Sequence, residues 1–399
     1  MPARFSKPFS LPDQLPNKPT LAPQFSIPVV SMGYSAPASF YLGERVSSAT
    51  LDFLDENHLL FSFRVPGLLH REAGTSAEEE RQIRAVVIGV ATGAVEAEAV
   101  WAVHDRARYL WMLPGGRFLL RDRNTLKEAD ASLELKPVFR FPGDILWMDA
   151  DPSGQYLVTE SREPASGSKS VDPTAGAQVA VQGQNVASST DLRLRILRRD
   201  SGQVVLTSRI RSTIRLPINN EGYLESLRMN ATQWMVALHL FAGSSRMLGR
   251  VETACAPQLE FLTPRIVLAT GCTASGNARL TALETDGKRL WEAVDSDRAL
   301  WPLVTPAAQG SRFLRQTLVA SHAVSARSPV DTADLKGQLT LALDAVDGQM
   351  TLAAVAKPIY DAGGNAALSP SGRRAAILED GAIQIFDLPP VPELVLPVR

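Results

Sequence analysis

From about residue 45 the chain consists of short apolar runs that are separated by turn residues. Short runs that are bounded by turn residues and rich in β-branched and aromatic residues are typical of β-strands. Extended amphipathic helical periodicity is hard to find, and the one local helix candidate is the charged segment Ser76–Arg81. The pattern therefore predicts an all-β protein.

Two kinds of turn recur between these runs. The first kind joins two strongly apolar runs, and its centres fall near residues 56, 115, 153, 231, 264, 309 and 371. The second kind ends in glycine, which supplies the positive φ that tight hairpin loops need. It occurs at Thr92-Gly93, Ser201-Gly202, Asp286-Gly287 and Asp347-Gly348. The repetition indicates hairpin units that recur along the whole chain.

Seven strand–turn–strand units, each followed by further strands, predict a seven-bladed β-propeller of four-stranded antiparallel blades. Each unit alone leaves an apolar sheet face uncovered, and stacking of neighbours around an axis covers it. The interval between the turns near 231 and 264 is too short for a full blade. The fourth blade would therefore lack a strand, unless the count is wrong, so six and eight blades stay open as alternatives.

We expect one propeller domain over residues 40–390, between a Pro-rich N-terminal tail or tether (1–39) and a C-terminal tail (391–399). Residues 163–190 are rich in Ser, Gly, Ala and Gln without aromatics, which is typical of a flexible insertion. The last C-terminal strand would be only the third of its blade. An N-terminal strand, from either Phe25–Val30 or Phe40–Val46, is expected to complete that blade and close the ring.

The segment Ser369–Leu388 resembles one blade of the WD-repeat β-propellers. Its turn Ser369-Pro370-Ser371-Gly372 corresponds to that family's Ser-Pro-Asp-Gly, and Phe386-Asp387 stands where the family has Trp-Asp. Residues 281–291 are similar instead to the Trp-docking repeat of quinoprotein-like propellers, with Gly287, Lys288 and Trp291 in place. The resemblance implies a propeller fold rather than a quinone cofactor. No Trp-Asp dipeptide occurs, so the structural tetrad of true WD repeats is expected to be absent.

Composition and charge argue against two classes of protein, those that bind nucleic acid and those that span a membrane. Hydrophobic residues make up 45% of the 399 residues, which suffices for a packed core, and the formal net charge of -1 argues against a nucleic-acid partner. The apolar stretch Ala85–Val103 could imitate a membrane span, but Glu96 and Glu98 lie inside it and favour a hairpin. No transmembrane segment is expected.

The sequence offers no local signature of a catalytic or metal site. The five histidines lie far apart, and Cys-x-x-Cys, phosphate-loop, dinucleotide-binding and Gly-x-Ser-x-Gly motifs are all missing. We therefore single out no catalytic, metal-ligating or cofactor-binding residue. The expected function is that of a non-enzymatic binding or scaffold module, monomeric, which binds an unknown protein or small ligand on a propeller face. The alternative is an enzyme whose active site lies at the mouth of the central channel.

Cys255 and Cys272 are the sole cysteines, and they flank an apolar hairpin. If a two-residue turn is centred on Thr263-Pro264, the cysteines lie opposite each other, within reach of a disulfide. Two buried free thiols are the alternative. A disulfide indicates work outside the reducing cytosol, so we expect a periplasmic or extracellular protein, with a cytoplasmic one as the alternative.

The most basic region is the strand around Leu192–Arg199, which contains Arg193, Arg195, Arg198 and Arg199. Alternation places Arg193 and Arg195 on one face, opposite the leucines and Ile196. A solvated outer strand explains this pattern, and a surface for an anion or a protein partner is the alternative. The tryptophans on or beside apolar strands are expected to pack between blades.

Overall fold

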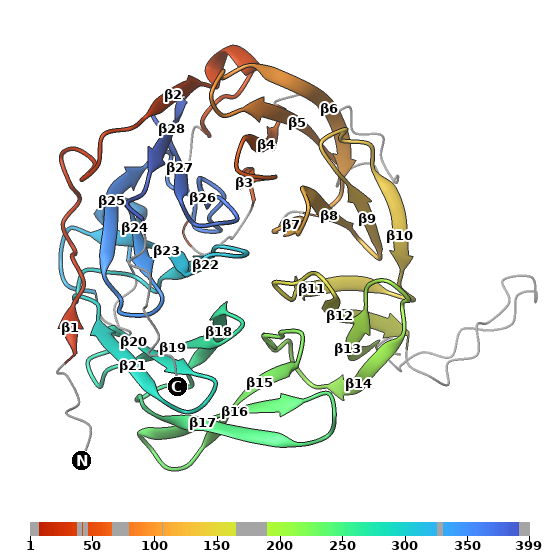
Figure 1. Ribbon diagram of the computed structural model, residues 1–399, viewed down its shortest axis with the longest axis vertical. Coiled ribbons are helices and arrows are strands. Elements are labelled where there is room, and N and C mark those ends of the chain that lie inside the picture. The colour runs from red at the N-terminus through yellow and green to blue at the C-terminus, as the bar shows by residue number, and fades with distance from the viewer. Residues whose placement is uncertain are drawn as a thin grey trace, which may run out of the picture.

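The computed structural model describes residues 8–37, 42, 47–65, 80–105, 107–164, 190–324 and 330–390. The described strands form seven sheets arranged in a ring around one axis (Figure 1). Within these residues the only helical segments are the short 3-10 turns η1 (Val30–Met32) and η3 (Thr332–Asp334). The predicted seven-bladed β-propeller is confirmed. The helix candidate at 76–81 lies almost entirely outside the described residues.

Four blades each consist of four antiparallel strands that follow one another in the chain. Blade 1 contains β3 (Ala49–Phe53), β4 (His58–Arg64), β5 (Arg81–Gly89) and β6 (Val95–Val103). Blade 2 contains β7 (Leu110–Leu113), β8 (Arg117–Asp122), β9 (Thr125–Ala129) and β10 (Lys136–Arg140). Blade 3 contains β11 (Asp144–Ala150), β12 (Tyr156–Pro164), β13 (Thr190–Arg198) and β14 (Val204–Ile210). Blade 6 contains β22 (Leu303–Pro306), β23 (Arg312–Ala320), β24 (Leu335–Asp344) and β25 (Met350–Ala356).

The other three blades depart from this arrangement. Blade 4 has only β15 (Gly222–Arg228), β16 (Gln233–Leu240) and β17 (Ser245–Glu252) among the described residues. Blade 5 has β18 (Gln258–Thr263), β19 (Ile266–Cys272), β20 (Ala278–Glu284) and β21 (Arg289–Val294), to which β1 (Phe9–Ser10) adds in parallel. Blade 7 joins β26 (Ala366–Leu368), β27 (Arg374–Glu379) and β28 (Ala382–Asp387) to the N-terminal strand β2 (Phe25–Pro28).

The two kinds of turn have fixed places in the blades. All seven turns of the first kind connect the first and second strands of a blade, from blade 1 to blade 7. The glycine turns connect the third and fourth strands of blades 1, 3, 5 and 6. Gly287 in one of them has φ +99°, a conformation that side chains other than glycine rarely adopt. The short interval before residue 264 is explained by the missing fourth strand of blade 4.

The ring closes through the N-terminal segment, as predicted for Phe25–Val30. Strand β2 pairs antiparallel with β28, with Phe25 opposite Ile385 and Ile27 opposite Ile383. Before it reaches β2, the segment bonds to the edge of blade 6 at Thr20, whose amide donates to the Ala353 carbonyl and whose hydroxyl accepts from the Ala353 amide. It thus follows the outer edges of blades 5, 6 and 7 (Figure 1). Of the alternative, Phe40–Val46, only residue 42 is described, and the insertion at 165–189 and the tail at 391–399 lie outside the description. The domain boundaries stay a prediction.

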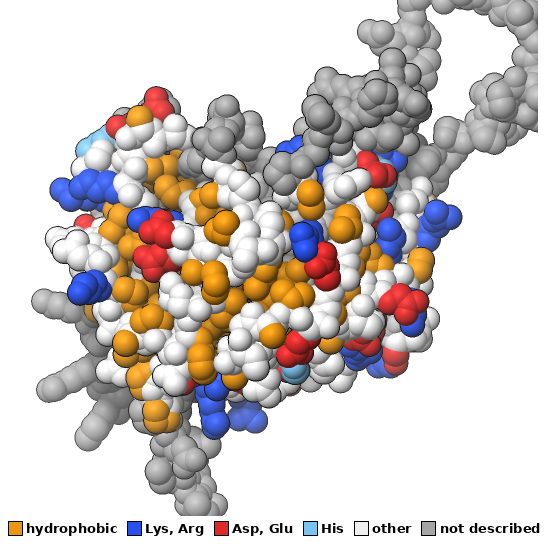
Figure 2. All heavy atoms as spheres, turned by 90° about the horizontal axis from the view of Figure 1, so that it is seen from above, with side chains coloured by type: hydrophobic (Ala, Val, Ile, Leu, Met, Phe, Trp, Pro, Cys, Tyr) orange, Lys and Arg blue, Asp and Glu red, His pale blue; other side chains and the backbone are white. Residues whose placement is uncertain are grey.

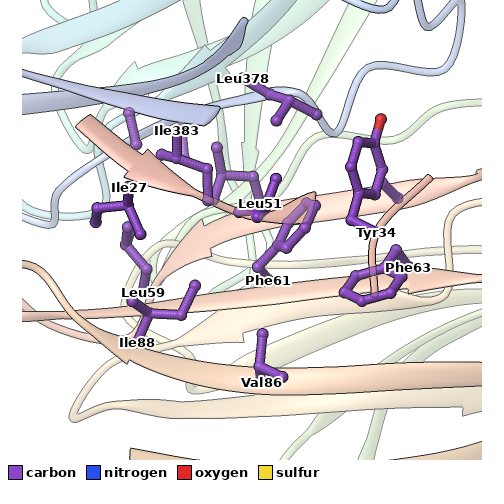
Figure 3. Close-up of a cluster of buried hydrophobic side chains, with 14 of the residues drawn as sticks. Ile27, Tyr34, Leu51, Leu59, Phe61, Phe63, Val86, Ile88, Leu378 and Ile383 are labelled. Carbon is purple, nitrogen blue, oxygen red and sulfur yellow. The ribbon is translucent and has the colours of Figure 1, made fainter. Parts of the chain in front are cut away.

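The closing segment is buried between blade 7 and blade 1 (Figure 3). Ile27 and Tyr34 pack there against Phe61 and Phe63 of β4 and Ile383 of β28. The Tyr34 ring lies 5.3 and 5.6 Å from the two phenylalanine rings in edge-to-face arrangements. Because both chain ends meet in this one apolar cluster, its burial holds the first and last blades together.

Tryptophans link other neighbouring blades. The Trp101 indole of blade 1 donates to the Leu133 carbonyl in blade 2 at 3.2 Å. In blade 5, Trp291 donates to the Ala345 carbonyl of blade 6 at 2.8 Å and stacks on Phe313 with centroids 6.2 Å apart. These contacts are the inter-blade packing expected from the sequence. The outer rim, by contrast, mixes acidic, basic and apolar side chains on the face that Figure 2 shows.

The closing segment offers a matched pair of substitutions. Val29 is fully buried, whereas its neighbour Val30 is 64% exposed. We expect Val29→Ala to lower the free energy of unfolding by about 2 kcal/mol, because it removes buried methyl groups and leaves a cavity. We expect Val30→Ala to change it by less than about 0.5 kcal/mol. Denaturant unfolding of both variants measures the difference, and equal effects would contradict closure by this segment.

Candidate functional site

The innermost strands of three non-adjacent blades each place an acidic residue near the propeller axis. These residues are Asp52 on β3, Asp149 on β11 and Glu260 on β18. Arg108, just before β7 of blade 2, interacts electrostatically with all three carboxyl groups. Arg215, just before β15, interacts with Asp149 and Glu260. Groups from such separated blades come into range only if their side chains turn toward the axis. We call these five residues the axis cluster.

Strand alternation explains why Asp52 and Glu260 point away from the apolar clusters beside them. Leu51 and Phe53, on either side of Asp52, are buried between blades 7 and 1. Because successive side chains of a strand point to opposite faces, Asp52 points the other way. Glu260 lies in the same manner between Leu259 and Phe261, which pack toward blade 4. The apolar neighbours therefore fix the direction of each acidic group.

Burial shifts the ionisation of the cluster. Burial raises the pKa of Asp52 to about 7 against the opposing charge of Arg108. Burial, reinforced by the negative charge of Asp149, raises the pKa of Glu260 to about 8. Burial also raises the pKa of Asp149. The positive charges of Arg108 and Arg215 oppose this shift, as does the hydrogen bond that the Ala150 amide donates to the Asp149 carboxylate. The negative charge of Asp149 thus acts on Glu260, and at neutral pH Glu260 still holds its proton.

A chain of buried hydroxyl groups connects blade 1 to the residue next to Arg108. The Thr50 and Ser62 hydroxyls lie 2.7 Å apart, and the Ser62 hydroxyl lies 2.8 Å from the hydroxyl of Tyr109. Tyr109 directly follows Arg108, so this chain ties blade 1 to the segment that carries the arginine. The Arg108 guanidinium also lies over the Trp111 ring, 5.1 Å from its centroid. These contacts hold Arg108 in place.

An aromatic side chain lies beside the acidic groups. Trp301, at the start of blade 6, is 37% exposed, and its indole donates to the Gln258 side chain at 3.0 Å. Gln258 and Glu260 are two residues apart on β18, so they share one face of that strand. An apolar ring just before β22 thus contacts the strand that carries the protonatable carboxyl group of Glu260.

The predicted cysteine pair lies away from the axis cluster. The structure joins Cys255 and Cys272 in a disulfide, with Cα atoms 5.6 Å apart. The pairing of β18 with β19 is shifted by one residue from the register that a two-residue turn would give, so Glu260 lies opposite Leu268. The shift arises because the pairing is irregular next to Thr263. The Thr253 hydroxyl accepts the amide of Cys272 at 2.7 Å and so anchors the pair.

The arginines of β13 are engaged inside the molecule. Arg195 bonds to Glu163 and to the Ser161 hydroxyl. Arg199 pairs with Glu128 of blade 2 at 2.9 Å. Arg198 lies over the Tyr156 ring, 5.7 Å from its centroid, and Arg193 acts electrostatically on Glu163. Binding of an anion or a partner by these four residues stays a prediction.

The axis cluster contains residues that the sequence analysis did not single out. Its carboxyl groups come from positions that are distant in the chain, so no local motif marks them. A signal was present, however. Each acidic residue interrupts an apolar run directly before a turn of the first kind, in LDFL, LWMDA and LEFL. An acidic residue inside an otherwise apolar inner strand is the pattern that could have found the site.

The described residues contain neither a candidate metal site nor a membrane-spanning helix. No group of three or more His, Cys, Asp and Glu side chains could hold a metal ion. No helix in the described part of the chain is long and apolar enough to cross a membrane.

Comparison with known proteins identifies the fold only. No family model and no curated protein sequence matches the chain. Similar solved structures include the acylaminoacyl peptidase of Pyrococcus horikoshii, with a TM-score of 0.45, 10% identity and coverage of 86% of this chain and 53% of that one. The chain thus spans about half the length of this peptidase.

WD-repeat propellers appear in the same comparison. The C-terminal WD40 domain of Sif2 has a TM-score of 0.40 and 8% identity, with coverage of 93% of this chain and 99% of that one. A chain of the mitotic checkpoint complex has a TM-score of 0.43 and 10% identity, with coverage of 96% and 100%. At such low similarity these structures carry no functional argument.

The expectation of a non-enzymatic binding or scaffold module is corrected. The similar structures include peptidases, at a level that shows the fold alone. The physical reason for the correction is at the axis, where titratable groups of shifted pKa gather instead of the flat, mixed surface expected of a scaffold.

The raised pKa of Glu260 makes a prediction about stability. Because its pKa of about 8 exceeds its ordinary value of 4.5, the folded state holds this proton more tightly than the unfolded state. Stability should therefore fall as the pH rises from 5 to 8. We expect Glu260→Gln to remove this loss and to gain about 2 kcal/mol over the wild type at pH 8. Unfolding at several pH values measures it, with the exposed Glu252→Gln as control, and parallel profiles would contradict it.

Proposed function

We propose that the protein is an enzyme that performs general acid–base chemistry on a small substrate at the propeller axis. The observation that carries this proposal is the pair Asp149 and Glu260, in which burial and the negative charge of Asp149 raise the pKa of Glu260 to about 8. Pairs whose environments separate their protonation states are the usual acid and base of an active site. A hydrolysis whose leaving group must be protonated fits this pair best.

Each member of the axis cluster has a role in this proposal. Protonated Glu260 donates a proton to the leaving group, and Asp149 accepts a proton from the attacking water. Arg108 and Arg215 keep Asp149 ionised and offer donors to a polar group of the substrate. Trp301, which bonds to Gln258 on the strand of Glu260, provides an apolar surface for the rest of the substrate.

Turnover of chromogenic substrates tests the proposal. Panels of aryl glycosides, aryl esters and aminoacyl anilides should reveal at least one hydrolysed substrate. We expect Glu260→Gln and Asp149→Asn each to lower kcat/KM by about 10²- to 10⁴-fold, because each removes one proton-transfer group. Glu252→Gln, an exposed position on blade 4, should leave it unchanged. Full activity in both variants, or no turnover of any panel, would refute the proposal.

We further propose a periplasmic or extracellular location, on the basis of the bond between Cys255 and Cys272. Intact mass after alkylation of the denatured, unreduced protein tests the redox state of the pair. We expect no added alkyl group without reductant and two after reduction. Two alkyl groups before reduction would mean free thiols and would favour the cytoplasm instead.

A further inference from the structure

A chain of three polar side chains crosses blade 4, separate from the axis cluster. The Ser245 hydroxyl of β17 lies 2.8 Å from Nδ1 of His239 on β16. The other ring nitrogen of His239 lies 2.8 Å from a carboxylate oxygen of Glu225 on β15, an ion-pair contact without hydrogen-bond geometry. The three residues lie on one face of the sheet, because each comes from a neighbouring strand and the contacts are direct.

The histidine ring has a fixed orientation. Tyr223 lies directly opposite His239 in the strand pairing, and the two rings stack with centroids 5.0 Å apart and an angle of 21°. With Glu225 at one nitrogen and Ser245 at the other, the ring connects a carboxylate to a hydroxyl. A hydroxyl, a base within hydrogen-bond reach and a carboxylate that orients the base are the components of an activated serine.

The edge of blade 4 adds a backbone donor to this arrangement, because β17 is the outermost of its described strands. Leu240 donates its amide to the carbonyl of Ser244, so the next pair, His239 and Ser245, is a non-hydrogen-bonded pair. The amide N–H of Ser245 therefore points away from β16, toward the open edge of the sheet. In the other six blades the third strand is covered by a fourth, but no described strand pairs with β17. An unpaired amide thus lies next to the exposed Ser245 hydroxyl.

We propose that Ser245 is a nucleophile that accepts acyl groups from small esters, with His239 as its base. The Ser245 hydroxyl oxygen attacks the ester carbonyl carbon while His239 takes the hydroxyl proton. The Ser245 amide donates to the carbonyl oxygen, where negative charge develops. Collapse of the intermediate breaks the bond to the alcohol, which leaves with the proton from His239. Water then cleaves the acyl-serine by the same steps, which frees the acid and restores the hydroxyl.

The role of Glu225 is to position His239. Its carboxylate contacts the ring and not the substrate, and it stabilises the imidazolium that forms during attack. The substrate class follows from the surroundings. Because Ser245 is exposed on a sheet edge with one backbone donor, the site suits short, unhindered acyl groups rather than a long peptide. This site does not depend on the axis cluster, and neither proposal needs the other.

A fluorophosphonate probe, which reacts covalently with activated serines, tests the proposal on the full chain. We expect labelling of the folded protein at Ser245, located by peptide mass spectrometry, and none after heat denaturation. Ser245→Ala should abolish the labelling, and His239→Gln should slow it at least 100-fold. Ser226→Ala, on the innermost strand β15 of the same blade, should leave it unchanged.

Hydrolysis of p-nitrophenyl acetate provides the second measurement. Glu225→Gln should lower kcat about 10-fold or more without raising KM, because the variant misorients the base and leaves substrate binding intact. Thermal unfolding of each variant shows that it is folded. Labelling at another serine, labelling that survives Ser245→Ala, or no labelling of the folded wild type would each overturn the proposal. Since Glu260→Gln should not affect the labelling, failure here is distinguishable from failure at the axis.

Discussion

Every blade of this propeller depends on its neighbours to cover an apolar sheet face. Burial of those faces supplies the main driving force, and a ring is the arrangement that leaves no face uncovered. This constraint makes the closing contact decisive, because an open ring exposes the faces of two blades at once. The apolar cluster around Ile27, Tyr34 and Phe61 meets that need by joining the N-terminal segment to both end blades. Burial, rather than the few backbone bonds of β2, accounts for the closure.

Ring closure also explains the chemistry at the axis. Asp52, Asp149 and Glu260 belong to blades that do not touch one another, so only the complete ring brings them within electrostatic range. Their shifted pKa values follow from the same packing, because the apolar neighbours that bury the inner strands also strip water from the carboxyl groups. Arg108 and Arg215 oppose these shifts only in part, because the pKa of Asp52 still reaches about 7 and that of Glu260 about 8. Carboxyl groups with such shifted pKa values are typical of functional sites.

The sequence revealed the architecture better than the sites. Turn residues and apolar runs are local signals, so all seven first turns and the short fourth blade could be located in advance, and the closing strand could be narrowed to two segments. The disulfide partners were also found, although an irregular turn at Thr263 shifted the register by one residue. Asp52, Asp149 and Glu260 escaped notice because their proximity is a property of the ring. Ser245 and His239 escaped for a similar reason, since no motif records a contact across strands.

The position of β2 has a consequence for the order of folding. Ile27 and its partner Ile383 are about 350 residues apart in the chain. At ribosomal speeds of about 5–20 residues per second, the N-terminal strand waits on the order of 20–70 s before its partner has been synthesised. During that time Ile27 lacks the cover that Ile383 and Ile385 of β28 give it in the native structure. Folding of this protein is therefore completed only at the end of synthesis, and a chain that is cut short before β28 lacks the strand to which its beginning must pair.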